Sequence, residues 1–459
     1  MALSEAGASG APRPGAFALI ARIAAWCTDA SDRSTAQRTA GAAFLIRVAS
    51  AGIIYLSQVL LARWMGRFEF GIYVYVWAWV GFLGMASTLG IATASQRLVP
   101  EYRTRGDFDG LRGYLAGARI MGFSLGSAAG ALLAGSALAL GDGIPTYYVI
   151  PFLIASLTLP IFTTGSVQDL MGRALNWIDL ALLPGFIAHP LAILVVMSAL
   201  YAAGFTITAV TALATACVAL WAMILVQSAV LNRRLRDKVP PGACRYEPLA
   251  WLRTALPLFF VDGFFLMLTN VDTLILQLFV GPADVAVYYA ATKTLALVNF
   301  IYFAVGAACA HRFSEYHVAG DHDRLAHLLA DSIRWTFWPS LVLVIVLLAL
   351  GQPILSLFGP GFADGYPLIW IMMAGLLARA AVGPAERLLN MIGQQAICAA
   401  IYGTAFAVNL ALCLLLIPHL GLHGAAIATA SAVLTESTLL FVVSKRRLGM
   451  HVFIWGGPS

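Results

Sequence analysis

Apolar runs of about 20 residues recur along the whole chain, and they constrain its fold more than any other feature. Each run is long enough to cross the roughly 30 Å hydrocarbon core of a bilayer as a helix. The runs are continuous rather than alternating, which favours helices over a barrel, because a helix satisfies its own backbone hydrogen bonds in lipid. The predicted spans cover residues 41–62, 71–96, 113–137, 147–168, 179–203, 206–231, 255–279, 284–310, 335–351, 366–386, 396–417 and 424–443. We therefore expect an all-α polytopic membrane protein with about 12 transmembrane helices.

The charged residues indicate how these helices are oriented. Only 11% of the chain is charged, compared with about 25% in soluble domains. The net charge of +6 would by itself suit nucleic acid or anionic lipid, but its placement follows the predicted topology. With the N-terminus inside, 22 of the 28 Lys and Arg residues fall in inside segments, and only Arg63 and Arg67 fall in outside loops. This bias predicts that both termini are cytoplasmic, and it removes the reason to expect a nucleic-acid partner.

One polar stretch occurs twice. PEYRTRGDFDGLRGYLA (100–116) and SEYHVAGDHDRLAHLLA (314–330) are identical at eight of 17 positions when offset by 214. Six predicted spans separate them, so both face the same side and the repeat is parallel. We predict two six-helix lobes, with Asp109 and Asp323 capping helix starts in the two copies. The arginines of the first copy are absent from the second, which indicates a role in orientation rather than in substrate binding.

The repeat divides the chain into five predicted parts. They are a mobile cytoplasmic N-terminal tail (1–40), an N-terminal six-helix lobe (41–231), a basic cytoplasmic linker (232–254), a C-terminal six-helix lobe (255–444) and a cytoplasmic C-terminal tail (445–459). Two such lobes suit a transporter that rocks one lobe against the other around a central site. The alternative is that duplication merely produced a large helix bundle.

Three blocks resemble a known family. They are LARWMGRFEFGIY (61–73), SLFGPGF (356–362) and NLALCLLLIPHLGLHGAAIATA (409–430). They are similar to the blocks of bacterial polysaccharide and O-antigen repeat-unit flippases, which belong to the multidrug/oligosaccharidyl-lipid/polysaccharide exporter superfamily. The resemblance covers about residues 40–445. It departs at Ala286, where the second half of the family pattern usually has Gly.

The resemblance implies a secondary transporter of the bacterial inner membrane rather than an enzyme, with no cofactor. Its implied substrate is an undecaprenyl-pyrophosphate-linked oligosaccharide for exopolysaccharide or lipopolysaccharide synthesis, and its implied partners are membrane lipids, a polysaccharide polymerase and export machinery. No lysine lies in a phosphate-cradling G-x-x-x-x-G-K-[ST] loop, in keeping with the absence of an ATPase. The alternatives are a cation-coupled multidrug exporter or a peptidoglycan-precursor flippase of the same superfamily. An integral glycosyltransferase agrees less well with the short loops, and a membrane scaffold would not need charges within the spans of both halves.

Four basic residues lie within predicted spans: Arg47, Arg119, Lys293 and Arg379. A charge at the bilayer centre costs roughly 2.5–3.5 kcal/mol, so it usually faces a partner or a wet cavity. We therefore predict a cationic cavity that binds the pyrophosphate group. The alternatives are that Arg47 and Arg119 snorkel to the cytoplasmic surface, and that Arg379 pairs with Glu386.

The acidic residues inside the spans are confined to the second half. Asp262 and Asp272 in the seventh span are candidates for proton or sodium coupling. The alternative is structural pairing with Lys293 or with polar neighbours. His189 is interpreted as an interior histidine with a satisfied hydrogen bond. No metal site is expected, because neither the histidines of the second repeat copy nor the six cysteines have ligand spacing.

Overall fold

The computed structural model describes residues 32–448 and 452–455, and this part of the chain is helical without strands. The side chains of Arg47, Asp262 and several neighbours in the same helices lie outside the described residues. The helices are α2 (Asp32–Ser87), α3 (Ile91–Arg105), α4 (Phe108–Ala139), η1 (Gly141–Gly143), α5 (Thr146–Ala174), α6 (Ile178–Leu183), η2 (Pro184–Ala188), α7 (His189–Ala202), α8 (Ala209–Lys238), α9 (Pro248–Phe279), α10 (Pro282–Val318), α11 (His322–Ser356), η3 (Phe362–Gly365), α12 (Tyr366–Val382), α13 (Ala385–Met391), α14 (Gln395–Leu420) and α15 (Leu422–Leu448).

These helices make twelve passes. Ten helical segments of the described chain are long and apolar enough to span a membrane. One of them, α2, supplies two passes because it reverses direction at Gly66, whose φ of 75° suits a residue without Cβ. The 32-residue α9 supplies the remaining pass. The prediction of an all-α polytopic membrane protein with about twelve transmembrane helices is therefore confirmed.

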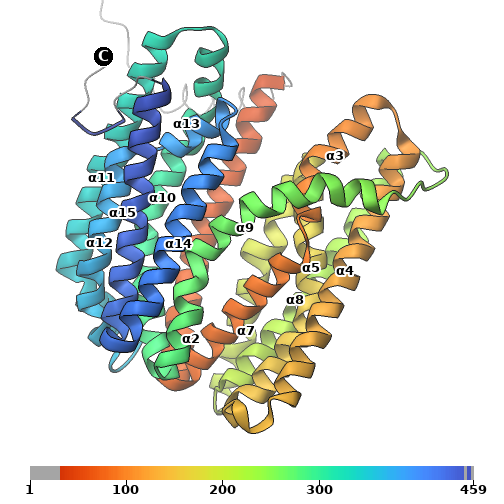
Figure 1. Ribbon diagram of the computed structural model, residues 1–459. Coiled ribbons are helices and arrows are strands. Elements are labelled where there is room, and N and C mark those ends of the chain that lie inside the picture. The colour runs from red at the N-terminus through yellow and green to blue at the C-terminus, as the bar shows by residue number, and fades with distance from the viewer. Residues whose placement is uncertain (1–31, 449–451, 456–459) are drawn as a thin grey trace, which may run out of the picture.

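The passes form two lobes (Figure 1). The second part of α2 and helices α3–α8 make one lobe, and α10–α15 make the other. Helix α9 belongs to both. Near its start, Trp251 Nε1 donates a hydrogen bond of 3.1 Å to the hydroxyl of Tyr102 in α3. Near its end, Thr429 of α15 donates a hydrogen bond of 3.1 Å to Asp272. Thus α9 physically joins the two lobes.

The repeated stretch forms the same turn in each lobe. Gly106 and Gly320 end their helices with φ of 68° and 69°, the left-handed conformation that glycine adopts easily. The following backbone N–H donates to the carbonyl of Tyr102 in one copy and of Tyr316 in the other, at 3.0 Å in both. The sequence similarity therefore reflects a conserved corner between consecutive helices.

The caps lie two residues before the predicted positions. Asp107 and Asp321 each accept a hydrogen bond from the backbone N–H three residues later, at 2.9 and 3.0 Å. The prediction that Asp109 and Asp323 are the caps is wrong, because the helices begin one residue before each of them. In the first helical turn they still favour the positive end of the helix dipole.

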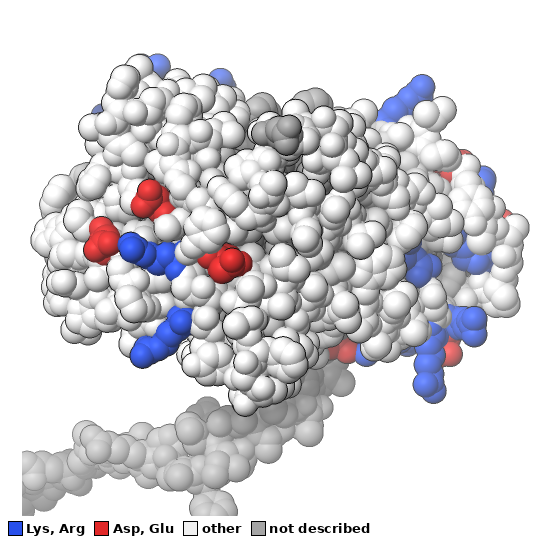
Figure 2. Space-filling view, turned by 90° about the horizontal axis from the view of Figure 1, so that it is seen from below, with Lys and Arg blue, Asp and Glu red and all other residues white. Residues whose placement is uncertain are grey.

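The turns alternate between two ends of the molecule. We call one the basic end: it holds the turn between α3 and α4, the linker at 239–247 and the turn between α10 and α11 at 319–321. The opposite end holds the turn at Gly66, and Figure 2 views the molecule from that side. Most of the surface seen there is uncharged. The charged residues in or beside the described turns of that end include Arg63, Arg67, Glu69, Asp284 and Asp364.

The lobes touch at the opposite end and diverge towards the basic end (Figure 1). Phe70 in the second part of α2 is fully buried, with edge contacts to Tyr289 of α10 at 5.9 Å and to Phe362 of η3 at 6.2 Å. Gly71 approaches Pro282 so closely that a Cβ there would overlap the Pro282 backbone. The opposite end is therefore closed by direct packing of α2 against α10.

Candidate functional site

A cavity of about 480 Å³ lies between the lobes, beyond this closed end. One wall comes from the second part of α2 and from α5, and the other from α9, α10, α12, α14 and α15. Lys293, a lining residue, lies 11 positions into α10, about 16 Å along the helix. The cavity therefore lies well inside the membrane-spanning part of the molecule, where transporters of repeated lobes place their substrate.

The two walls differ in chemistry. The first-lobe wall is apolar and aromatic: Val74, Trp77, Ala78, Gly81, Phe82 and Phe162. Trp77 is held between two rings, stacking with Tyr73 at 6.2 Å and with His189 at 5.8 Å between centroids. His189 is buried and its Nε2 lies 3.1 Å from the carbonyl oxygen of Ala216. This contact confirms the interpretation of His189 as an interior histidine with a hydrogen-bond partner.

The second-lobe wall carries the charged groups of the cavity: Asp272, Lys293, Arg379 and Glu436. Asp272 accepts hydrogen bonds from the hydroxyl of Tyr288 at 2.5 Å, from Thr429 at 3.1 Å and from the backbone N–H of Thr273 at 2.8 Å. Three donors from α9, α10 and α15 thus converge on one buried carboxyl group. This one side chain therefore links three helices through its hydrogen bonds.

Arg379 forms an ion pair across the cavity wall. Its Nη2 lies 3.4 Å from Glu436 Oε1, although that oxygen accepts no aligned hydrogen bond. Its guanidinium also lies over the Tyr302 ring, 4.7 Å from the centroid. Glu386 instead accepts a hydrogen bond of 3.0 Å from the Tyr302 hydroxyl. The sequence alternative that Arg379 pairs with Glu386 is therefore not what the structure shows, because Gly383 breaks the helix between them.

Lys293 differs from Arg379 in its surroundings. Its ammonium lies 4.8 Å from the centroid of the Tyr289 ring. Within the described part of the chain it has no carboxylate at ion-pair distance, although Asp272 lies near enough to interact electrostatically. A lysine ammonium has three donors and no acceptor, so it can bind an anionic group without first losing a partner. Lys293 is thus the available cation of this cavity.

The structure brings together three of the six residues predicted as site residues: Asp272, Lys293 and Arg379. Arg119 lies elsewhere, in a separate pocket between α4 and α8, where its Nη1 donates a hydrogen bond of 2.6 Å to Asn232 Oδ1. Its prediction as a lining residue of the central cavity is therefore corrected. The side chains of Arg47 and Asp262 lie outside the described residues, so these two remain predictions.

Other lining residues were not singled out by sequence reasoning. Asn409 is fully buried, and its Nδ2 has no hydrogen-bond partner among the side chains that the structure describes, although it begins the family block at 409–430. Tyr288, which donates a hydrogen bond to the lining residue Asp272, was not predicted either. Gly66 and Tyr73 recur 215 residues later as Gly281 and Tyr288, and this repeat is the signal that could have identified it. Among the described residues, no group of three or more His, Cys, Asp and Glu side chains is arranged to hold a metal ion.

Comparisons with known proteins agree with this geometry. The family model described as "Polysaccharide biosynthesis protein" matches residues 38–317, more than half of the chain, and the MatE model matches residues 257–415. A comparison with curated protein sequences gives no match. The fold is shared with many solved structures, three of which are described below.

A structure described as the lipid II flippase MurJ in an inward closed conformation has a TM-score of 0.69 and 16% identity, covering 87% of each chain. An inward-facing multidrug resistance MATE family transporter has a TM-score of 0.67 and 15% identity, covering 88% of this chain and 98% of that one. A transporter from Pyrococcus furiosus, described as having a binding pocket of reverse polarity, has a TM-score of 0.63 and 13% identity, covering 90% and 95%. The chain belongs to the polysaccharide biosynthesis protein family and is a multi-pass transporter of the multidrug/oligosaccharidyl-lipid/polysaccharide exporter superfamily.

Proposed function

We propose that this transporter moves an undecaprenyl-pyrophosphate-linked oligosaccharide from the inner to the outer leaflet of the bacterial inner membrane, for exopolysaccharide or O-antigen synthesis. The single observation that carries the proposal is Lys293, which lies in a cavity between two lobes and has no carboxylate at ion-pair distance among the side chains that the structure describes. A pyrophosphate group carries concentrated negative charge and offers only acceptors. It would therefore bind this ammonium by charge-assisted hydrogen bonds.

Arg379 serves as a second cation in this proposal. Its pairing with Glu436 leaves a guanidinium hydrogen available, since Nε has no hydrogen-bond partner among the described residues. A guanidinium presents donors in a planar fork that matches phosphate oxygens. We propose that Lys293 and Arg379 together hold the two phosphates, and that Trp77 on the facing apolar wall stacks on a sugar ring.

The direction of opening follows from the charge distribution. The positive-inside rule places the basic end in the cytoplasm. Because the lobes pack together at the other end, the structure would then represent a state that accepts substrate from the cytoplasm. Rocking of the lobes would open the end at Gly66 and Gly71, exposing the same cavity to the outer side.

Asp272 is the candidate for coupling transport to an ion gradient. It faces the cavity and links α9, α10 and α15 through its three hydrogen bonds. Binding of a proton or a sodium ion to this carboxyl would change the hydrogen bonds that hold the three helices together. Transport by Asp272→Asn should therefore lose its dependence on the ion gradient, whereas unchanged dependence would remove Asp272 from the coupling step.

Export of organic cations is a second candidate function, because Asp272 and Glu436 also line the cavity. Both carboxylates are already engaged, one by three hydrogen-bond donors and the other by Arg379. A cationic substrate would also meet Lys293 and Arg379, which repel it. A test of resistance to cationic dyes in cells that produce the protein separates the two functions.

The decisive test of substrate is deletion of the gene in the bacterium that carries it. We expect a lipid-linked oligosaccharide to accumulate on the cytoplasmic leaflet and polymer export to stop. Lys293→Ala should fail to restore export at normal protein level, whereas Arg312→Gln, a charge loss at an exposed site on the same helix, should restore it. Loss of one charge-assisted hydrogen bond predicts roughly ten- to hundredfold weaker binding. Normal export by Lys293→Ala would refute the role of this residue.

A further inference from the structure

A second basic pocket lies on the outside of the first lobe, away from the central cavity. It has a volume of about 430 Å³ and lies between α4, α8 and the linker at 239–247. Three arginines line it: Arg112 and Arg119 from α4, and Arg236 from α8. None of the described residues that line it is acidic. One carboxylate nearby, that of Asp109, is bound to Arg112, so the pocket retains net positive charge.

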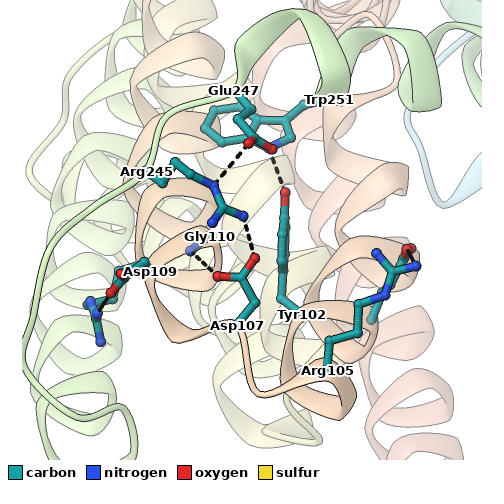
Figure 3. A network of polar contacts seen from close by, with 10 residues as sticks. Tyr102, Arg105, Asp107, Asp109, Gly110, Arg245, Glu247 and Trp251 are labelled. Carbon is teal, nitrogen blue, oxygen red and sulfur yellow. Dashed lines mark hydrogen bonds and ion pairs between the residues drawn. The ribbon is translucent and has the colours of Figure 1, made fainter.

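The linker forms one side of this pocket and is held in place by the repeated corner. Arg112 Nε donates a hydrogen bond of 2.8 Å to the carbonyl of Ala243, and its Nη1 donates one of 2.5 Å to the carbonyl of Pro240. Arg245 donates its backbone N–H to the carbonyl of Asp109 at 3.0 Å. Figure 3 shows the Arg245 guanidinium between Asp107 and Glu247, at the base of the same segment.

Arg119 and Arg236 are the arginines with donors to spare. Arg119 Nε donates a hydrogen bond of 2.8 Å to the Leu115 carbonyl of its own helix, and its Nη1 donates to Asn232. Its Nη2 has no hydrogen bond to any residue that the structure describes. Arg236 is exposed and has no hydrogen bond or ion pair within the described part of the chain. Two guanidinium groups from neighbouring helices therefore offer free N–H groups to one small space.

The position of the pocket matches the headgroup layer of a bilayer. Helix α4 has 32 residues and is about 48 Å long, which exceeds the roughly 30 Å hydrocarbon core, so its ends reach the headgroup layer. With α4 centred on the bilayer, about 9 Å of each end lies outside the core, so the backbone of Arg119, about 16 Å from the start of α4, lies roughly 7 Å inside the hydrocarbon boundary. A long arginine side chain spans that distance to the headgroup layer, and Arg236 lies in the last turn of α8 at the same end. Below Arg119, Ile120, Phe123 and Val226 are exposed apolar residues of α4 and α8 that acyl chains would cover.

We propose that this pocket binds the phosphate group of an anionic membrane lipid, with Arg119 and Arg236 as its principal ligands. Basic pockets between transmembrane helices on the cytoplasmic side are suited to such headgroups. Because the linker closes the pocket, a bound lipid would also hold α4, α8 and the segment that leads into α9. This site is separate from the central cavity and does not depend on the proposed transport substrate.

Cys244 provides a direct probe of occupancy. It lines the pocket and is exposed, whereas the other described cysteines, Cys217, Cys309, Cys398 and Cys413, are buried. The experiment uses the full chain carrying Cys27→Ser in bilayer nanodiscs of phosphatidylcholine, with or without phosphatidylglycerol. We expect phosphatidylglycerol to slow alkylation of Cys244 and to be retained by the purified protein in native mass spectrometry. Equal alkylation rates in both bilayers would overturn the proposal.

Substitutions identify the ligands. Arg119→Gln and Arg236→Gln should each weaken phosphatidylglycerol binding about tenfold, because each removes a charge-assisted hydrogen bond. Arg233→Gln is the matched control: it removes an exposed positive charge from the same helix but not from the pocket, so binding should not change. Equal weakening in all three variants would indicate general surface attraction and overturn the site. Arg236 is exposed, so its variant should fold normally.

Two further probes distinguish the source of the phosphate. Undecaprenyl diphosphate and inorganic pyrophosphate are each tested for protection of Cys244. Protection by phosphatidylglycerol, with or without protection by undecaprenyl diphosphate, supports the proposal if Arg236→Gln abolishes it, and the tighter of the two lipids identifies the occupant. Protection by inorganic pyrophosphate at the same concentration as the lipids would contradict a lipid site.

Discussion

Replacement of Gly71 by alanine tests whether the packed opposite end is a gate. A Cβ at this position would come within 3.0 Å of the Pro282 Cα and closer still to its carbonyl group. Carbon atoms in contact prefer 3.5–4.0 Å, and the Pro282 carbonyl carbon would lie only 2.4 Å away, so α2 and α10 would have to separate by about an ångström or more. Overpacking of this kind costs about 1–3 kcal/mol, and a central value of about 2 kcal/mol changes a two-state ratio about 30-fold.

This cost applies only to the state in which the opposite end is closed. Gly71→Ala should therefore shift the population towards the state that is open there. The assay is alkylation of Ala296→Cys, a lining residue of the cavity, by a membrane-impermeant reagent added outside intact cells. We expect the rate to rise by up to about 30-fold. The repeat counterpart of Gly71, at an offset of 215, is the fully buried Ala286, so only one half of the repeat uses glycine here.

Gly52→Ala is the control, since a Cβ there would meet no atom within 4 Å and it lies on the same helix. It should leave the alkylation rate unchanged. If Gly71→Ala also left the rate unchanged, with normal protein level and a normal unfolding temperature, the contact between α2 and α10 would not be a gate, and the account of alternating access would be refuted at this point.

Two further predictions concern charged pairs. Glu436→Gln removes the carboxylate that neutralises Arg379 and should lower the free energy of unfolding by about 3–5 kcal/mol. The double variant Arg379→Met with Glu436→Leu should recover much of the protein level without recovering export. Normal stability of Glu436→Gln would show that the pair is not structural. At the basic end, the hydrogen bond from Gly110 and the guanidinium of Arg245 hold the pKa of Asp107 below its usual value. A carboxyl group with a lowered pKa stabilises the fold above its unfolded pKa of about 4, and this stabilisation is lost as the pH falls through the folded pKa. Asp107→Asn should therefore lower the unfolding temperature at neutral pH and leave it nearly unchanged in strong acid. An equal decrease at both pH values would contradict this.

The sequence was sufficient for the number of helices and for the repeat, because both follow from local patterns. Runs of apolar residues define the passes, and the Gly-Asp turn reproduces one backbone geometry in both lobes. The sequence also identified Lys293, Arg379 and Asp272, since charges inside apolar runs are rare and usually face a cavity.

Which side of each helix faces the cavity, and which charged residues pair, could not be predicted from the sequence because both depend on how the helices pack. Arg119 lies within a span like Lys293, but the rotation of its helix turns it towards α8 and the lipid rather than the centre. Successive helical positions differ by about 100°, so a span boundary known to a few residues cannot predict the facing side. The partner of Arg379 could not be predicted because α12 ends at Gly383. After this break Glu386 accepts a hydrogen bond from Tyr302, and Arg379 pairs with Glu436 instead.

The central claim is tested most directly by transbilayer movement of a lipid-linked oligosaccharide in liposomes that contain only the purified protein. Substrate that crosses the bilayer becomes accessible to an impermeant glycosidase, so the accessible fraction measures flipping. The account predicts movement by the wild-type protein and by Arg312→Gln, and movement slowed roughly ten- to hundredfold by Lys293→Ala. Absence of movement with the wild-type protein across substrates with different sugars, or equal movement with Lys293→Ala, would contradict it.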